Sequence, residues 1–302
     1  MFESTIVHFA EVARDKASAM RRSPTGFAVA SMMGGAYIGI AMILALSVAA
    51  GLPAGVRPLA MGGVFGVGLI LTVFAGAELF TGYVMYVGFG VARATVTWSE
   101  ALAMLVTVWI GNALGAITLA GVFAAGGGGS VFAAGADMLH GYVAHKVEAD
   151  WLALVARAAL CNWLVCLAIW TAARVTGDAA KCMVLAWTLM AFVAAGFEHS
   201  VANMTALSLG LLVPSASIDA SGALRNLVLV TGGNLLGGAV FVVLGYLRAA
   251  RTDLEGTVQH DCGPLPTTLR RPKPEGADAS TADRQPPHRE HRSNQLKRGA
   301  AR

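Results

Sequence analysis

Charged residues are scarce in this sequence. Only 13% of its 302 residues are Asp, Glu, Lys or Arg, whereas about 25% is usual for a soluble globular domain. Hydrophobic residues make up 56%, and no Asp, Glu, Lys, Arg or His occurs between Arg22 and Arg57. These apolar stretches are long enough to cross a bilayer core of about 30 Å. The composition therefore excludes a soluble globular domain and indicates a membrane protein.

The sequence also lacks the motifs of common metal and nucleophile sites. Its four cysteines show no C-x-x-C spacing, and neither H-E-x-x-H nor G-x-S-x-G occurs. We expect no cofactor, no metal ion and no nucleic-acid binding. The first 25 residues carry seven charged side chains and no apolar run, so a cleavable signal peptide is not expected.

Six apolar regions remain, and each is long enough to cross a membrane. They cover residues 27–52, 58–92, 101–136, 151–175, 182–218 and 226–247. The second and fifth are about 35 residues long, although a straight helix needs only about 20 to cross. Each contains a carboxylate, Glu78 or Glu198. We therefore expect each to be two half-helices joined by an irregular loop that faces protein or a cavity.

The six spans form a predicted channel domain over residues 26–248, with a separate N-terminal segment before it and a C-terminal segment after it. In residues 1–25 the apolar residues recur at helical spacing opposite the charges. This pattern predicts an amphipathic helix at the cytoplasmic membrane surface, either an interfacial anchor or a docking or gating element. Residues 249–302 are rich in proline and charge, which predicts a disordered tail. Lys and Arg concentrate on one side of the spans, so the positive-inside rule places both termini in the cytoplasm.

One sequence pattern occurs twice. Glu78 and Glu198 are 120 positions apart, and the strings G-N-A-L-G-A from Gly111 and G-N-L-L-G-G from Gly233 are 122 apart. The chain thus contains a duplication with three spans in each copy. Because three is odd, the second copy enters the membrane from the opposite face. The result is an inverted three-plus-three repeat, typical of transport proteins whose site lies near the membrane midplane between broken helices.

His199 is the only histidine within a predicted span. An ionisable side chain inside a membrane is by default a functional candidate. Burial favours neutral imidazole and an arriving anion favours imidazolium, so anion occupancy and protonation of His199 are coupled. A cation pathway would instead show exposed acidic rings, and metal transport would need more than one His or Cys ligand. The alternative is that His199 only packs.

The buried carboxylates Glu78 and Glu198 need compensation, because an isolated ionised carboxylate is strongly disfavoured in a low-dielectric interior. We expect each to accept hydrogen bonds from the free backbone N–H groups at its own helix break and so to hold the loop. A proton relay is the alternative. Asn112 and Asn234 occupy matching repeat positions beside small residues and are interpreted as structural.

Other polar residues leave two interpretations open. Asn162 and Asn203 could fix the tautomer of the His199 imidazole, or they could act as helix-packing residues. Lys146 precedes the fourth span and could attract anions to the mouth of a pathway, or it could be a solvated surface charge. Apolar side chains could narrow the pathway or simply pack in the core: Phe65, Leu69, Leu79, Phe80 and Phe192.

Three segments resemble the signatures of the formate/nitrite transporter family. They are residues 76–82 (GAELFTG), 159–166 (ALCNWLVC) and 196–204 (GFEHSVANM), and the similarity extends over residues 24–246. The strings at residues 56–59 (VRPL) and 127–130 (GGGS) make the chain most similar to the nitrite branch. The resemblance implies an aquaporin-like fold of six helices, a homopentamer in a bacterial inner membrane, and one anion path through each protomer.

The same resemblance implies roles for individual residues. Thr81 and His199 would flank the centre of the path, between the apolar constrictions. Glu198, Asn162 and Asn203 match positions around the family histidine, and Lys146 matches a vestibule lysine. The expected function is nitrite transport in which the Thr81/His199 centre stabilises the anion or transfers a proton to it.

Several alternatives to nitrite transport stand beside it. Formate, lactate and hydrosulfide are the alternative substrates, because all are small monovalent anions of weak acids. An intramembrane enzyme that uses Glu198 and His199 as acid and base, or a pore for water or neutral solutes, is the alternative of another class.

Overall fold

The structure, a computed structural model, describes residues 1–213 and 218–250. This part of the chain is almost entirely helical, and five of its helices are long and apolar enough to cross a membrane. The elements are α1 (Glu3–Arg22), α2 (Pro24–Ala50), α3 (Arg57–Leu71) continued by the π-helical η1 (Thr72–Gly76), α4 (Phe80–Ala92), α5 (Trp98–Ala125), α6 (Gly129–Phe132), α7 (Ala136–Glu148), α8 (Trp151–Arg174), α9 (Asp178–Ala194), α10 (Ser200–Leu212), and α11 (Ala220–Leu236) continued by the π-helical η2 (Gly237–Leu244). The predicted tail lies outside the described residues from position 251 onward.

Helix caps explain where two predicted span boundaries are wrong. Ser23 accepts a hydrogen bond from the Gly26 N–H, so α2 begins at Pro24 and not at residue 27. Asp219 accepts from the Gly222 N–H, so α11 begins at Ala220 and not at residue 226. Side-chain oxygens at these positions satisfy backbone donors that the first helical turn leaves free.

The third predicted span is too long at its C-terminal end. It ends at Ala125 and not at residue 136. Gly127, Gly128 and Gly129 follow with φ angles of 92°, 68° and 48°, in the left-handed region that only glycine adopts at little cost. The rest of the predicted span is therefore the short helix α6 and the start of α7, and α7 was not predicted from the sequence.

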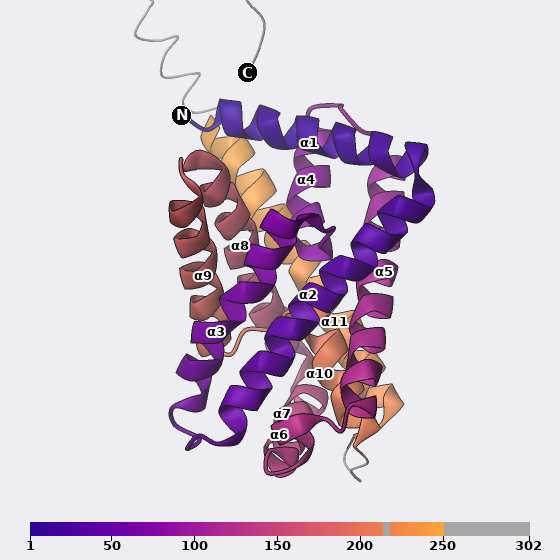
Figure 1. The fold of residues 1–302 in the computed structure, drawn as a ribbon. Coiled ribbons are helices and arrows are strands. Elements are labelled where there is room, and N and C mark those ends of the chain that lie inside the picture. Colours follow the sequence, from indigo (N-terminus) through magenta and orange to yellow (C-terminus); the bar gives the residue numbers. More distant parts are fainter. Residues whose placement is uncertain (214–217, 251–302) are drawn as a thin grey trace, which may run out of the picture. The chain divides into compact units, whose positions relative to one another are not determined.

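Spans two and five are broken, as predicted. Gly76 and Gly196 take φ angles of 81° and 72° at the two breaks, and each lies two residues before the glutamate of its repeat. Beyond the breaks, α4 and α10 begin in the middle of the bundle and run toward opposite ends (Figure 1). The N-terminal ends of two half-helices therefore meet at the centre of the bundle.

Asn112 on α5 holds the first break. Its Oδ1 accepts a hydrogen bond from the Phe80 N–H at 2.9 Å, and its Nδ2 donates to the carbonyl oxygens of Glu78 at 2.8 Å and Ser31 at 2.6 Å. One buried amide thus satisfies backbone groups of the break and of α2. The break can remain non-helical in an apolar environment because these groups are paired.

Asn234 on α11 makes the same set of bonds at the second break. Its Oδ1 accepts from the Ser200 N–H at 2.9 Å, and its Nδ2 donates to the carbonyl oxygens of Glu198 at 2.9 Å and Ala158 at 2.8 Å. The repeat seen in the sequence is therefore also a repeat of hydrogen bonds, and the structural interpretation of both asparagines fits these contacts.

Replacing Asn112 by alanine should destabilise the protein strongly. The substitution leaves one buried backbone donor and two acceptors without their partner, and each unsatisfied group costs roughly 1–3 kcal/mol. We expect a clear fall in the melting temperature of the detergent-solubilised protein. The control is Ser208→Ala, which removes only a hydroxyl bonded to the carbonyl of its own helical turn. Equal melting temperatures for the two variants would contradict the role of Asn112.

Helix α1 lies across one end of the bundle, and α6 and α7 lie at the other (Figure 1). The apolar face of α1 is buried against the protein, with Ile6, Phe9 and Ala13 almost fully inaccessible. Hydrogen bonds secure it, including Arg93 to Glu3 at 2.5 Å. The amphipathic helix was thus predicted at the right residues. Its apolar stripe contacts the protein, however, and is not free to lie on lipid.

Candidate functional site

The two breaks bring Thr81 and His199 into contact. Thr81 is the second residue of α4, and His199 is the N-cap residue of α10. Thr81 Oγ1 lies 3.2 Å from His199 Nε2, and both side chains are buried. The positive ends of two helix dipoles therefore point toward this contact, an arrangement that favours an anion.

The tautomer of His199 is fixed by its own helix. The Ala202 N–H donates a hydrogen bond to His199 Nδ1 at 3.1 Å. Since Nδ1 accepts, the neutral imidazole carries its hydrogen on Nε2, which faces Thr81. The histidine thus caps α10 with one nitrogen and presents an N–H donor with the other.

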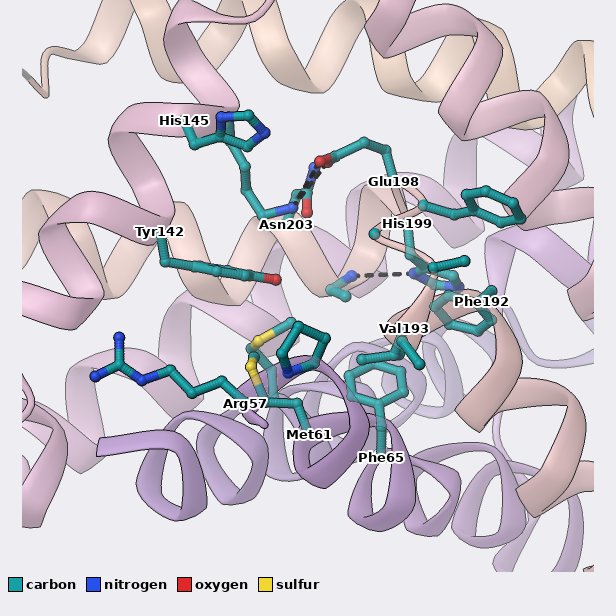
Figure 2. A pocket seen from close by; sticks show the side chains of 18 of the residues that line it. Arg57, Met61, Phe65, Tyr142, His145, Phe192, Val193, Glu198, His199 and Asn203 are labelled. Carbon is teal, nitrogen blue, oxygen red and sulfur yellow. Dashed lines mark hydrogen bonds and ion pairs between the residues drawn. The ribbon is translucent and has the colours of Figure 1, made fainter. Parts of the chain in front are cut away.

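Two phenylalanines pack around the imidazole. The Phe192 ring stacks on His199 with ring centres 5.8 Å apart, and Phe65 meets Phe192 edge-on at 5.7 Å. All three side chains line the same cavity (Figure 2). The imidazole of His199 is therefore flanked by aromatic side chains where it lines that cavity.

Glu198 is paired with Lys146 of α7. The Lys146 ammonium lies 2.9 and 2.8 Å from the two carboxylate oxygens of Glu198, and the two side chains are only 6% and 4% exposed. Burial opposes the charge on Lys146, but the Tyr142 and Glu198 side chains raise its pKa above the usual value. Lys146 is therefore buried as part of an ion pair, and its interpretation as a solvated surface charge is wrong.

Asparagine side chains close this ion pair into a ring of contacts. Asn203 Nδ2 donates to Glu198 Oε2 at 2.6 Å and to Asn226 Oδ1 at 2.9 Å. Asn226 Nδ2 in turn donates to the carbonyl oxygen of Lys146 at 2.9 Å. The ring connects α7, the second break, α10 and α11. Asn226 was not singled out from the sequence.

Glu78 at the first break has a lysine partner as well. Lys16 of α1 lies 2.7 Å from both Glu78 oxygens, and the Tyr83 hydroxyl donates to Glu78 at 2.9 Å. The expectation that each carboxylate binds the backbone of its own break is therefore wrong for both glutamates. The sequence did carry a signal for Lys16, which lies one turn from Ala13 and from Met20 on the apolar face of α1.

The two candidate amides do not bond to the imidazole. Asn162 Nδ2 donates to the Asn234 carbonyl at 2.7 Å, and Cys166 Sγ lies 3.6 Å from Asn162 Oδ1. Asn203 serves the Glu198 ring described above. The Ala202 backbone N–H therefore fixes the His199 tautomer. Asn162 instead binds α11 through the backbone of Asn234, the residue that holds the second break.

Two cavities approach the Thr81–His199 contact. The α7-side cavity, of about 600 Å³, is lined by α7 and reaches Phe65, Phe192 and His199. The α1-side cavity, of about 490 Å³, is lined by α1 and reaches Leu79 and Thr72. Among residues 1–213 and 218–250, none lines both cavities. His199 lines the α7-side cavity, Thr81 lines neither, and the next residue, Gly82, lines the α1-side cavity, so the Thr81–His199 contact lies at the closed section between them.

One face of α3 and η1 extends from the α7-side cavity, through the closed section, to the α1-side cavity. Met61 and Phe65 line the α7-side cavity, Thr72 lines the α1-side cavity, and Leu69 between them is buried and lines neither. Spacings of three and four residues place these side chains on one helical face. At 1.5 Å per residue, the closed section from Phe65 to Thr72 is about 10 Å long. Phe80 is also buried and lines neither cavity.

The geometry is that of two cavities separated by a short apolar barrier with two polar groups in it, within an inverted repeat. A family model described as formate/nitrite transporter matches residues 5–248. The chain belongs to the formate/nitrite transporter family. The nitrite transporter NirC of Escherichia coli strain K12 is 42% identical over 250 residues, which cover 82% of this chain and 92% of NirC.

Solved structures of formate/nitrite transporters agree with this fold. An FNT family ion channel superposes with a TM-score of 0.78 at 40% identity, covering 82% of this chain and 99% of that one. A pentameric formate channel with formate bound gives a TM-score of 0.65 at 29% identity over 77% and 99% of the two chains. The all-helical, aquaporin-like fold is therefore confirmed. The chain is a multi-pass membrane transporter of small anions and not an enzyme.

Proposed function

We propose that this formate/nitrite transporter carries nitrite through each protomer of a homopentamer in a bacterial inner membrane, with both termini in the cytoplasm. One observation carries the path: the buried Thr81–His199 contact lies between two cavities that open at opposite ends of the bundle. Nitrite is favoured over formate because identity to the nitrite transporter NirC is 42% over 82% of this chain, against 37% over 72% for a probable formate transporter of Methanothermobacter thermautotrophicus.

The closed section explains why polar groups are needed in it. Moving a small ion from water into a medium of low dielectric constant costs on the order of 20 kcal/mol in the idealised limit. The His199 Nε2–H and the Thr81 hydroxyl supply two hydrogen-bond donors at the point of greatest desolvation. An anion that displaces the Thr81–His199 contact can bind both. A proton transfer from the imidazole to the anion is the alternative means of lowering the same barrier.

The surface of the bundle has an apolar face suited to a membrane. A row of exposed apolar side chains runs along α5 at helical spacing: Leu102, Val106, Ile110, Leu114 and Ile117. Such a row contacts either lipid or a neighbouring protomer. Light scattering of the detergent-solubilised protein would give the mass of the oligomer.

Flux measurements test the substrate. The purified protein is reconstituted into vesicles, and initial influx is compared for nitrite, formate, lactate and hydrosulfide, with protein-free vesicles as the control. We expect nitrite to give the highest rate above the control. A formate rate well above the nitrite rate would assign the chain to the formate substrates, and rates equal to the control for all four anions would overturn anion transport itself.

A further inference from the structure

The α7-side cavity is lined by more positive charges than the Lys146–Glu198 ion pair accounts for. Its lining includes Arg57, Arg157 and Lys146, together with the histidines His145 and His199. Lys146 is neutralised by Glu198 at 2.8 Å. That pair contributes almost no net charge to the cavity. The attraction of an anion to this mouth must therefore come from other side chains.

Arg57 and Arg157 are the two remaining cations. Arg57 is the first residue of α3, and its Nε donates to the Leu52 carbonyl at 2.8 Å, which leaves the two terminal nitrogens directed elsewhere. Within residues 1–213 and 218–250, no carboxylate lies within ion-pair distance of either arginine. The cavity also contains Asp137, which is therefore not an ion-pair partner of either guanidinium.

His145 orients the second arginine. Arg157 Nη1 lies 3.3 Å from His145 Nε2. Because a guanidinium only donates hydrogen bonds, His145 Nε2 is the acceptor in this contact. In Figure 2, Arg57 and His145 lie on the side of the cavity away from His199 and Phe65. Arg57 thus lies in the part of the cavity lining that is distant from the Thr81–His199 contact, and Arg157 lines the same cavity beside His145.

The opposite mouth differs. The α1-side cavity is lined by the cations Lys16 and Lys181, but Lys16 is paired with Glu78 at 2.7 Å, and Lys181 lies 3.9 Å from Asp178. Both cations at this mouth therefore have a nearby carboxylate. Each end of the path has a Lys–Glu pair, but only the α7-side cavity is lined by arginines without a carboxylate partner among the described residues.

We propose that Arg57 and Arg157, with His145 as the positioning residue of Arg157, form a capture site for a small monovalent oxyanion at the mouth of the α7-side cavity. A planar guanidinium can donate two parallel hydrogen bonds to two oxygens of nitrite or of a carboxylate, which an ammonium cannot match. The site lies upstream of the Thr81–His199 contact and rests on the anion transport proposed above. It sets the concentration of anion at the barrier and does not lower the barrier.

Planar-bilayer recordings of the full-length protein can test this site, with nitrite added to one face at a time. The variants are Arg57→Gln/Arg157→Gln and the charge-preserving Arg57→Lys/Arg157→Lys. Arg14→Gln/Arg22→Gln is the matched control, because it removes two exposed arginines of α1 that line neither cavity. Each variant is recorded between about 0.01 M and about 0.15 M ionic strength, where the Debye length falls from about 30 Å to about 8 Å.

The glutamine pair should raise the KM for nitrite about 3- to 10-fold from one face only, with the saturating current nearly unchanged, since electrostatic attraction raises encounter rates by about 10-fold or more. The ionic-strength dependence from that face should weaken. The lysine pair should retain this dependence but keep a raised KM. The control pair should match the wild type.

Three outcomes separate the possibilities. An unchanged KM and unchanged ionic-strength dependence in the glutamine pair, with a conducting wild type, would overturn the capture site and leave anion transport intact. Equal effects of the control pair would also overturn it, because they would report only net charge. A wild-type protein that passes no anion would instead refute the proposed transport.

Discussion

Replacing His199 by asparagine should lower the nitrite flux of reconstituted vesicles by roughly 10- to 100-fold while the protein still folds. Losing one hydrogen bond to a charged group costs about 1.5–3 kcal/mol, and each 1.4 kcal/mol is a factor of ten in rate. Asparagine is a good N-cap residue, so it can replace His199 Nδ1 as the acceptor of the Ala202 N–H. Its shorter side chain does not reach Thr81. His199→Asn thus keeps the helix cap and removes the donor from the pathway.

His199→Gln is the matched variant for the donor itself. The glutamine amide can extend toward the position of Nε2 and donate a hydrogen bond, but it does not exchange a proton as imidazole does. If hydrogen bonding to the anion is sufficient, His199→Gln should retain much more flux than His199→Asn. If proton transfer is required, both variants should be slow. Flux equal to the wild type in His199→Asn would contradict any role of the imidazole in the path.

Much of the fold was predictable because membranes impose simple rules on sequence. Apolar length identified the spans, and an excess of length together with Glu78 and Glu198 identified both breaks. His199 was found because an ionisable side chain stands out within an apolar span. Each of these features is local in the sequence, or repeats at a fixed distance along it.

The partners of the two carboxylates at the breaks were not predictable in the same way. Lys16 and Lys146 lie 62 and 52 positions from Glu78 and Glu198, outside the predicted spans, where a charged residue is ordinarily solvated. Only the packing of α1 and α7 onto the bundle ends brings them to the breaks. The glycine run at Gly127 to Gly129 looked like the end of a span because its residues are uncharged. Its positive φ angles instead allow the turn that leads into α7.

The two lysines at the equivalent breaks contribute differently to stability, because their ion pairs are buried to different degrees. The Lys146–Glu198 pair is almost fully buried, with side chains 6% and 4% exposed, whereas those of Lys16 and Glu78 are 31% and 12% exposed. Water and ions can partly compensate an unpaired Glu78 but not an unpaired Glu198. The same pair of residue types at equivalent breaks should therefore respond differently to the same substitution.

Replacing Lys146 by methionine should lower the free energy of unfolding by about 3–5 kcal/mol, the cost of leaving one member of a buried ion pair without its partner. Glu198→Ala should be similarly harmful, reducing pentamer yield as well as flux. The double variant Lys146→Met/Glu198→Met should recover most of the lost stability, since apolar residues can replace a buried ion pair at little cost. Melting temperature and size-exclusion profile in detergent measure these effects.

Lys16→Met at the equivalent break is the matched control and should cost clearly less, because its partner Glu78 is more exposed. If the two single lysine variants lost equal stability, burial would not be the decisive difference between the breaks. If the double variant were no more stable than Lys146→Met alone, the unpaired charge of Glu198 would not be the cause of the loss. The Asn203–Asn226 contacts that complete the ring would then have to carry the stability of the second break.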